Sequence, residues 1–142
     1  MDLGIRGKVA LITGASDGLG LASARALAGE GAEIAIAARR PDRLRAAAEE
    51  ICAATGAEIL ALPADVTDRE QAERLVSDVA ARLGPVEILV ANSGGPRPGK
   101  FGDLAWEDWE NAFSQIVGPL HHLASAVLPS MKDRCWGRIV AI

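Results

Sequence analysis

Short apolar runs alternate with helical segments along nearly the whole chain, and this alternation constrains the fold more than any other feature. Four apolar runs rich in valine, isoleucine, leucine and alanine predict strands, at residues 8–13, 33–38, 58–63 and 86–91. Segments with helical spacing separate these runs, at residues 19–30, 41–55 and 68–83. Because successive strands joined by a helix lie parallel, the rhythm predicts an α/β fold with a parallel sheet.

The second half of the chain continues this rhythm after one loop. Residues 92–103 are rich in glycine and proline, which predicts a loop. Residues 106–131 have a long helical pattern, in which Gly118 and Pro119 suggest a break. Residues 137–142 begin a fifth strand, and the sequence ends inside it.

Composition excludes several classes of protein. The 142 residues are 49% hydrophobic and 24% charged, which is typical of one globular domain with an apolar core. The net charge of −4 argues against a nucleic-acid partner, since binding phosphates requires a concentrated basic face. No apolar run approaches the roughly 18 residues of a membrane span, and no signal peptide is visible. We therefore expect a cytoplasmic protein without a membrane or nucleic-acid partner.

The cysteine and tryptophan residues are assigned structural roles. Cys52 and Cys135 have neither CxxC nor Cys/His spacing, so we predict no disulfide and no metal site, and expect both to be buried or half-buried. Trp106, Trp109 and Trp136 are expected to pack around the fourth helix and the entrance to the fifth strand, rather than to form a stacking platform.

A glycine-rich turn between the first strand and the first helix is the main candidate site. Residues 13–20 read TGASDGLG and place glycines where a backbone can approach a pyrophosphate. The helix N-terminus there offers free amides and roughly half a unit of positive charge. The motif has the spacing GxxxGxG and lacks the GK[ST] of nucleoside triphosphatases. The alternative to a dinucleotide site is a turn with a purely structural role. The candidate dinucleotide-binding residues of this turn are Gly14, Ser16, Asp17, Gly18, Leu19 and Gly20.

The end of the second strand indicates which dinucleotide would bind. A site for NAD usually has Asp or Glu there, whereas the 2′-phosphate of NADP needs a cation. The chain has Ala38, Arg39 and Arg40 at this point. Guanidinium groups bind phosphate through paired, charge-assisted hydrogen bonds. We therefore predict NADP(H) over NAD(H), with Arg39 as the first contact; the alternative is that Arg39 and Arg40 only solvate the strand end.

Several motifs together resemble the short-chain dehydrogenase/reductase family. TGASDGLG resembles the family's TGxxxGxG motif, and Asp65 in ADVTD resembles its acidic residue after the third strand. ANSGG at residues 91–95 resembles its NNAG motif, and WGRIVAI at residues 136–142 resembles the lead into its catalytic strand. The resemblance covers essentially all of the chain. It implies a Rossmann-type doubly wound parallel sheet, truncated here within the fifth strand, and one NAD(P)-binding domain over residues 1–142 that is incomplete at its C-terminus.

The resemblance also implies roles for residues after the third and fourth strands. Asp65 would hydrogen-bond the adenine amino group, with Val66 beside it. Asn92, Ser93 and Gly94 would line the ribose and nicotinamide side, Asn92 largely through its backbone. The stretch NSGGPRPGKF further resembles a 3-oxoacyl-[acyl-carrier-protein] reductase-like subgroup.

Family chemistry uses a Tyr general acid, a Lys that lowers the pKa of that Tyr, and a Ser that binds the substrate oxygen. This chain contains no tyrosine, and the three catalytic positions would lie beyond Ile142, so no catalytic residue is assigned and enzymatic activity stays open. The place of the family's proton-relay asparagine is assigned to Ile116, with Asn111 on another helical face.

Two hypotheses about function remain. The first is an NADP(H)-dependent short-chain oxidoreductase that transfers hydride between nicotinamide and a carbonyl or secondary alcohol, present here as its cofactor-binding half. The second is a catalytically incompetent nucleotide-binding fragment or remnant. The partners are then a nicotinamide dinucleotide and, for a longer version, a small carbonyl or alcohol. A homo-oligomer is left open.

Overall fold

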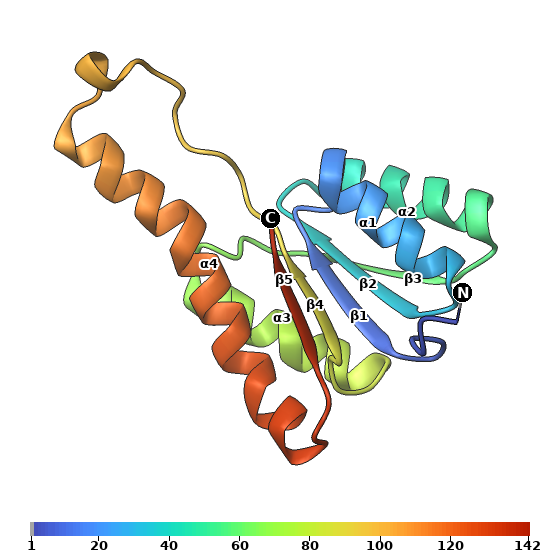
Figure 1. Ribbon diagram of the computed structural model, residues 1–142. Helices are drawn as coiled ribbons and strands as arrows, with labels where there is room; N and C mark the ends of the chain where they lie inside the picture. The colour runs from blue at the N-terminus through green and yellow to red at the C-terminus, as the bar shows by residue number, and fades with distance from the viewer. Residues whose placement is uncertain (1) are drawn as a thin grey trace.

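The computed structural model describes residues 2–142 and consists of a parallel sheet with helices on both faces (Figure 1). The elements follow one another as β1 (Val9–Thr13), α1 (Gly18–Gly29), β2 (Glu33–Ala38), α2 (Pro41–Thr55), β3 (Ile59–Pro63), α3 (Arg69–Arg82), β4 (Ile88–Ala91), the 3₁₀ turn η1 (Phe101–Asp103), α4 (Trp106–Asp133) and β5 (Arg138–Ala141). The alternation of strands and helices predicted from the sequence is confirmed, although β4 begins two residues later than expected and β5 ends one residue before Ile142.

The sheet has the doubly wound topology. Its strand order is β3-β2-β1-β4-β5, and every neighbouring pair is parallel. The chain moves outward from β1 to β3 and then crosses back to place β4 on the other side of β1. Ligands of open α/β sheets bind where the strand order reverses, at the carboxyl ends of the strands. In this molecule that point lies between β1 and β4.

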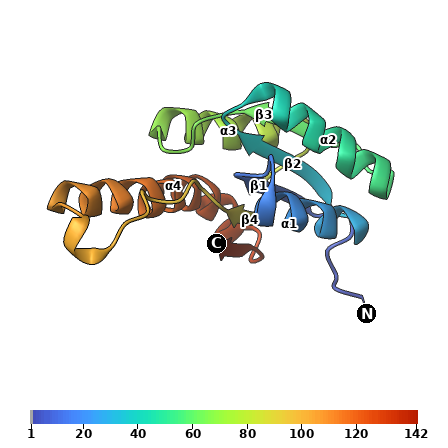
Figure 2. The same ribbon diagram turned by 90° about the horizontal axis from the view of Figure 1, so that it is seen from above.

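The core has two halves, one on each face of the sheet. Alternate residues of β1 point to opposite faces: Val9 and Leu11 pack with α3 and α4, whereas Ala10 and Ile12 pack with α1 and α2. Figure 2 shows the sheet between these two pairs of helices. Burial on both faces explains why the strands read as continuous apolar runs instead of alternating with polar residues.

Local signals set the ends of the helices. Pro41 occupies the first turn of α2, and Gly56 ends this helix in the left-handed conformation with φ of 73°, its N–H donating to the Cys52 carbonyl at 2.8 Å. Asp68 caps α3, because its carboxylate accepts a hydrogen bond from the Gln71 N–H at 3.1 Å. The predicted bounds of α2 are confirmed, whereas α3 is one residue shorter at each end than predicted, with Asp68 and Leu83 as its caps.

The predicted break in the fourth helix is wrong. α4 runs without interruption through Pro119. A proline inside a helix has no N–H for the carbonyl four residues earlier, which here belongs to Gln115. The Ser93 hydroxyl, on the loop after β4, donates to that carbonyl at 2.9 Å. The freed acceptor is therefore satisfied from outside the helix, and the helix continues.

The expected burial of both cysteines is also wrong. Cys52 and Cys135 are free and exposed. Cys52 follows Ile51, which is fully buried, and adjacent helical residues point about 100° apart, so Cys52 lies outside the buried stripe of α2. Cys135 lies in the turn after α4, where its φ is 52°.

Two of the three tryptophans do not pack as predicted. Trp106 is 72% exposed and Trp109 is 46% exposed. The first half of α4 projects beyond the sheet, so its apolar residues have no sheet face to cover (Figure 1). Trp109 instead contacts Phe101, with ring centroids 5.9 Å apart. Trp136 is partly buried against the α1/α2 half of the core, as expected.

Residues 2–142 form neither a membrane-spanning helix nor a cluster of metal-ligating side chains. None of the helices in this part of the chain combines the length and apolarity that crossing a membrane requires. No cluster of histidine, cysteine or acidic side chains suited to a metal ion occurs in the same range.

Candidate functional site

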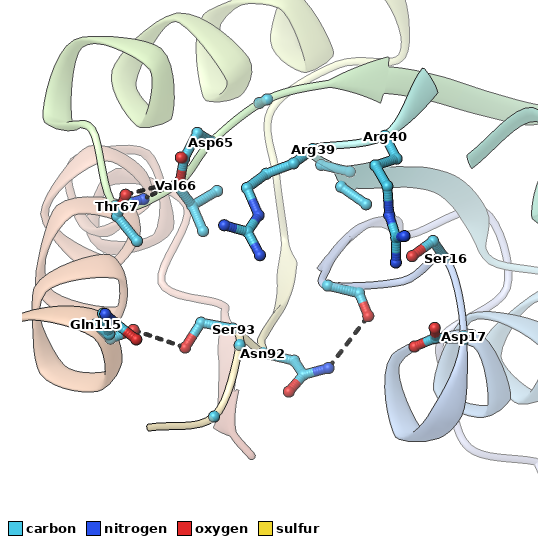
Figure 3. A pocket seen from close by; sticks show the side chains of 16 residues that line it. Ser16, Asp17, Arg39, Arg40, Asp65, Val66, Thr67, Asn92, Ser93 and Gln115 are labelled. Carbon is cyan, nitrogen blue, oxygen red and sulfur yellow. Dashed lines mark hydrogen bonds between the residues drawn. The ribbon is translucent and has the colours of Figure 1, made fainter. Parts of the chain in front are cut away.

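A cavity of about 370 Å³ opens at the carboxyl edge of the sheet, where the strand order reverses between β1 and β4. The loops after β1, β2, β3 and β4 all contribute to it, and α4 contributes one residue (Figure 3). Its lining consists of Gly14, Ser16, Asp17, Ala37, Ala38, Arg39, Arg40, Ala64, Asp65, Val66, Thr67, Asn92, Ser93, Gly94, Gly95 and Gln115.

The glycine-rich turn forms the wall of the cavity next to α1. Gly14 has φ of 58°, and a Cβ there would lie 2.9 Å from both the Nδ2 and the carbonyl oxygen of Asn92. A Cβ at Gly20 would overlap the Gly14 carbonyl oxygen and lie 2.9 Å from the Ala15 Cα. Gly20 thus lets the first turn of α1 pack directly on the loop. This packing aims the helix N-terminus at the cavity, where its free amides favour an anion.

Thr13 and Asn92 join the ends of β1 and β4 beneath the cavity. Thr13 is 1% exposed, and its hydroxyl donates to the Asn92 carbonyl at 2.7 Å while accepting from the Asn92 N–H at 3.0 Å. The Asn92 side-chain amide donates to the Gly14 carbonyl at 3.2 Å. Hydrogen bonds within the chain therefore hold the two central loops together at the base of the cavity.

Arg39 and Arg40 project from the end of β2 and are both exposed. Figure 3 shows the Arg39 side chain extending into the cavity and the Arg40 side chain lying beside Ser16. The Arg39 Nη2 lies 3.9 Å from the position that a Cβ on Gly94 would take, so this guanidinium spans most of the cavity. Two positive charges thus face one opening at the place where the sequence predicts an anionic group.

Asp65 and Val66 form the wall that follows β3. The Asp65 Oδ1 accepts hydrogen bonds from the Thr67 N–H at 3.1 Å and the Thr67 hydroxyl at 2.7 Å, which fixes a turn. Val66 is 8% exposed and packs into the core below. The turn leaves Asp65 Oδ2 with no hydrogen-bond donor from the described part of the chain.

Most predicted site residues meet at this cavity. Gly18, Leu19 and Gly20 do not line it, because they belong to the first turn of α1 behind the loop, and Leu19 is 65% exposed. The other predicted residues all line it: Gly14, Ser16, Asp17, Arg39, Arg40, Asp65, Val66, Asn92, Ser93 and Gly94.

Sequence reasoning missed two polar groups of the site. Thr67 lines the cavity through the turn made by Asp65, a pattern visible as Asp-x-Thr after a strand. Gln115 reaches it from α4, whereas Ile116, to which the relay position was assigned, lies at a separate small hollow beside β5. The assignment of the family's relay position to Ile116 stays a prediction.

Comparison with known proteins decides the family. A family model described as short chain dehydrogenase matches residues 8–142. The chain belongs to the short-chain dehydrogenase family. The family predicted from the motifs is confirmed, and its 3-oxoacyl-[acyl-carrier-protein] reductase-like subgroup stays a prediction.

Relatives and solved structures agree with this assignment. Glycine betaine reductase ATRR of Emericella nidulans is 43% identical over 139 residues, which are 97% of this chain and 11% of that protein. The 2,3-dihydro-2,3-dihydroxybenzoate dehydrogenase of Bacillus subtilis is 37% identical over 98% of this chain and 53% of its own length. L-sorbose reductase from Gluconobacter frateurii, solved with NADPH and L-sorbose, has a TM-score of 0.89 and 38% identity over 98% of this chain and 53% of that chain. This short-chain dehydrogenase chain spans about half the length of the last two.

Proposed function

We propose that this chain binds NADP(H) in the cavity at the carboxyl edge of the sheet, in preference to NAD(H). The observation that carries the proposal is the pair Arg39 and Arg40, which line the cavity directly after β2, where a carboxylate would select NAD. Support also comes from the L-sorbose reductase structure, which contains NADPH.

Each part of the dinucleotide has a matching group in the cavity. The pyrophosphate would lie at the N-terminus of α1 against Gly14 and Ser16, and the 2′-phosphate beside Arg39 and Arg40. The unpartnered Oδ2 of Asp65 would accept a hydrogen bond from the adenine amino group.

The nicotinamide end would then extend toward the loop after β4 and toward α4. Asn92, Ser93 and Gly94 line this side, and Gln115 adds a side-chain amide. The N–H of Asn92 is engaged by Thr13, so a backbone contact from Asn92 would use the second lone pair of its carbonyl oxygen. Nicotinamide, when bound, supplies or accepts the hydride.

For the whole protein we propose hydride transfer between nicotinamide and a carbonyl or secondary alcohol. Membership of an oxidoreductase family supports this reaction class. A second candidate for these 142 residues is cofactor binding without turnover, which is favoured by the absence of tyrosine from the sequence. The resemblance implies that a tyrosine supplies the catalytic proton.

Fluorescence titration with NADPH and NADH tests the cofactor proposal. We expect Arg39→Gln to weaken NADPH binding by about 10- to 100-fold, because charge-assisted hydrogen bonds to a phosphate are lost, while NADH binding changes less than about threefold. Arg82→Gln is the matched control, since Arg82 is exposed at the C-terminal end of α3. Equal binding of NADPH and NADH by the unmodified protein would refute the proposal. A parallel carbonyl-reduction assay separates binding from turnover.

A further inference from the structure

An acidic residue lies in the wall of a cavity that we propose to bind a phosphate. Asp17 lines the cavity between α1 and the glycine-rich turn, close to Ser16 and Arg40 in Figure 3. It is the N-cap residue of α1, yet its carboxylate makes no capping hydrogen bond. The side chain is instead directed to another group.

That group is Arg43, in the first turn of α2. Its Nη1 lies 3.6 Å from the Asp17 Oδ2, and both side chains are more than half exposed. The ion pair connects the starts of the two helices that cover one face of the sheet. Exposed pairs of this kind contribute little to folding stability, so stability alone does not account for the placement of Arg43.

The ion pair also changes the net charge beside the position proposed for the 2′-phosphate. A 2′-phosphate beside Arg39 and Arg40 would also experience the field of the Asp17 carboxylate, which repels it. Arg43 places a compensating positive charge next to that carboxylate. With Arg43 present, the two arginines after β2 act on the phosphate without an opposing charge from the glycine-rich turn.

We propose that Arg43 determines specificity for NADP(H) by neutralising Asp17. It is a positioning residue that acts through Asp17 and not through a contact with the phosphate. This inference rests on the proposed binding of NADP(H) at the same cavity. It predicts that Arg43 affects the binding of NADPH more than that of NADH, and only while the Asp17 carboxylate is present.

A double-mutant cycle with both cofactors tests the inference. Dissociation constants for NADPH and NADH are measured for the unmodified protein, Arg43→Gln, Asp17→Asn and the double variant. We expect Arg43→Gln to weaken NADPH binding by about three- to tenfold and NADH binding by less than about twofold. In the Asp17→Asn background, Arg43→Gln should change NADPH binding by less than about twofold, because no carboxylate remains to be neutralised.

Two further variants separate charge from structure. Arg43→Lys keeps the charge and should retain the binding of NADPH, and thermal unfolding of each variant shows that it is folded. Arg45→Gln is the matched control, because Arg45 is exposed on the same helix and makes no ion pair within residues 2–142; it should leave both constants unchanged within about twofold.

The outcomes are distinct from those of the proposed function. A loss of NADPH affinity that is equally large with and without the Asp17 charge would mean direct phosphate contact and would overturn the inference. Equal losses for NADPH and NADH, or no loss, would also overturn it while leaving the NADP(H) preference of the unmodified protein intact. An unmodified protein that binds NADPH no tighter than NADH would overturn both proposals.

Discussion

Gly14 and Gly20, in the turn between β1 and α1, have different physical roles. Position 14 requires glycine because its backbone is left-handed and Asn92 lies close to it. Position 20 requires glycine because a Cβ there would overlap the backbone of the loop. Both were predicted from the sequence to contact the cofactor. In the structure Gly20 does not line the cavity and instead sets how closely α1 packs on the loop.

The substitution Gly20→Ala should therefore destabilise the fold by about 1–3 kcal/mol, because the methyl group would displace backbone rather than a flexible side chain. It should also weaken dinucleotide binding, since the helix N-terminus would shift. Gly29→Ala is the control: Gly29 ends the same helix, a Cβ there meets no atom of the described chain within 4 Å, and a gain of about 0.5–1 kcal/mol is expected. Urea unfolding measures both, and similar effects at the two sites would contradict the argument.

At the scale of elements, α4 is coupled to the loop after β4. Pro119 removes the donor for the Gln115 carbonyl, and the Ser93 hydroxyl replaces it at 2.9 Å. The same hydrogen bond holds Ser93 and Gln115, two residues of the cavity lining, next to each other. A proline in a helix thus creates the acceptor that positions one side of the site.

We predict that Ser93→Ala lowers the free energy of unfolding by about 1 kcal/mol. In the Pro119→Ala background, where a helical N–H is available to the Gln115 carbonyl, the same substitution should cost at least about 0.5 kcal/mol less. Chemical unfolding of the two single variants and the double variant gives the coupling. Pro129→Ala is the control partner, because Pro129 lies inside the same helix ten residues further on. Ser93→Ala should be additive with Pro129→Ala, and additivity with Pro119→Ala as well would disprove the coupling.

Features that depend on residues close together in the sequence were predictable, whereas features that depend on distant residues were not. The positions of the strands and the ends of α2 and α3 were predictable to within about two residues, because apolar periodicity, Pro41, Gly56 and Asp68 act within a few residues. The continuity of α4 was not, since Ser93 satisfies Gln115 across 22 residues of sequence. Exposure of Trp106 likewise depends on how far α4 extends past the sheet, which no local pattern reports.

At the scale of the whole molecule, the two edges of the sheet differ. The carboxyl edge is open around the cavity, whereas Glu87 ties the amino edge together. Its carboxylate accepts hydrogen bonds from Lys8 Nζ at 2.8 Å and the Val9 N–H at 3.2 Å, and its carbonyl accepts from the Arg138 N–H at 2.9 Å. Lys8 and Arg138 both lie over the Trp136 ring, at 4.6 and 4.8 Å from its centroid. One residue thus connects β1, β4 and β5.

Burial alone would raise the pKa of Glu87, but the hydrogen bonds from Lys8 and Val9 and the charges of Lys8 and Arg134 outweigh it, so the pKa lies below its usual value of 4.5. A carboxyl group whose pKa is lowered on folding stabilises the fold at pH values above its unfolded pKa. This contribution is lost as the pH falls through the folded pKa. Glu87 therefore makes part of the stability of the sheet sensitive to acid below about pH 4.5.

Replacing Glu87 with Gln should lower stability by about 1–2 kcal/mol at pH 7, because the charged hydrogen bonds to Lys8 and Val9 are weakened. The difference from the unmodified protein should shrink steadily between pH 5 and pH 3, where the natural carboxylate becomes protonated and resembles the amide. Denaturant unfolding at pH 7, 5, 4 and 3 gives the difference at each pH. Glu33→Gln, at an exposed carboxylate where β2 begins, should change stability by less than about 0.5 kcal/mol. A Glu87→Gln difference that stays constant down to pH 3 would show that the side chain acts through its shape and not through its charge.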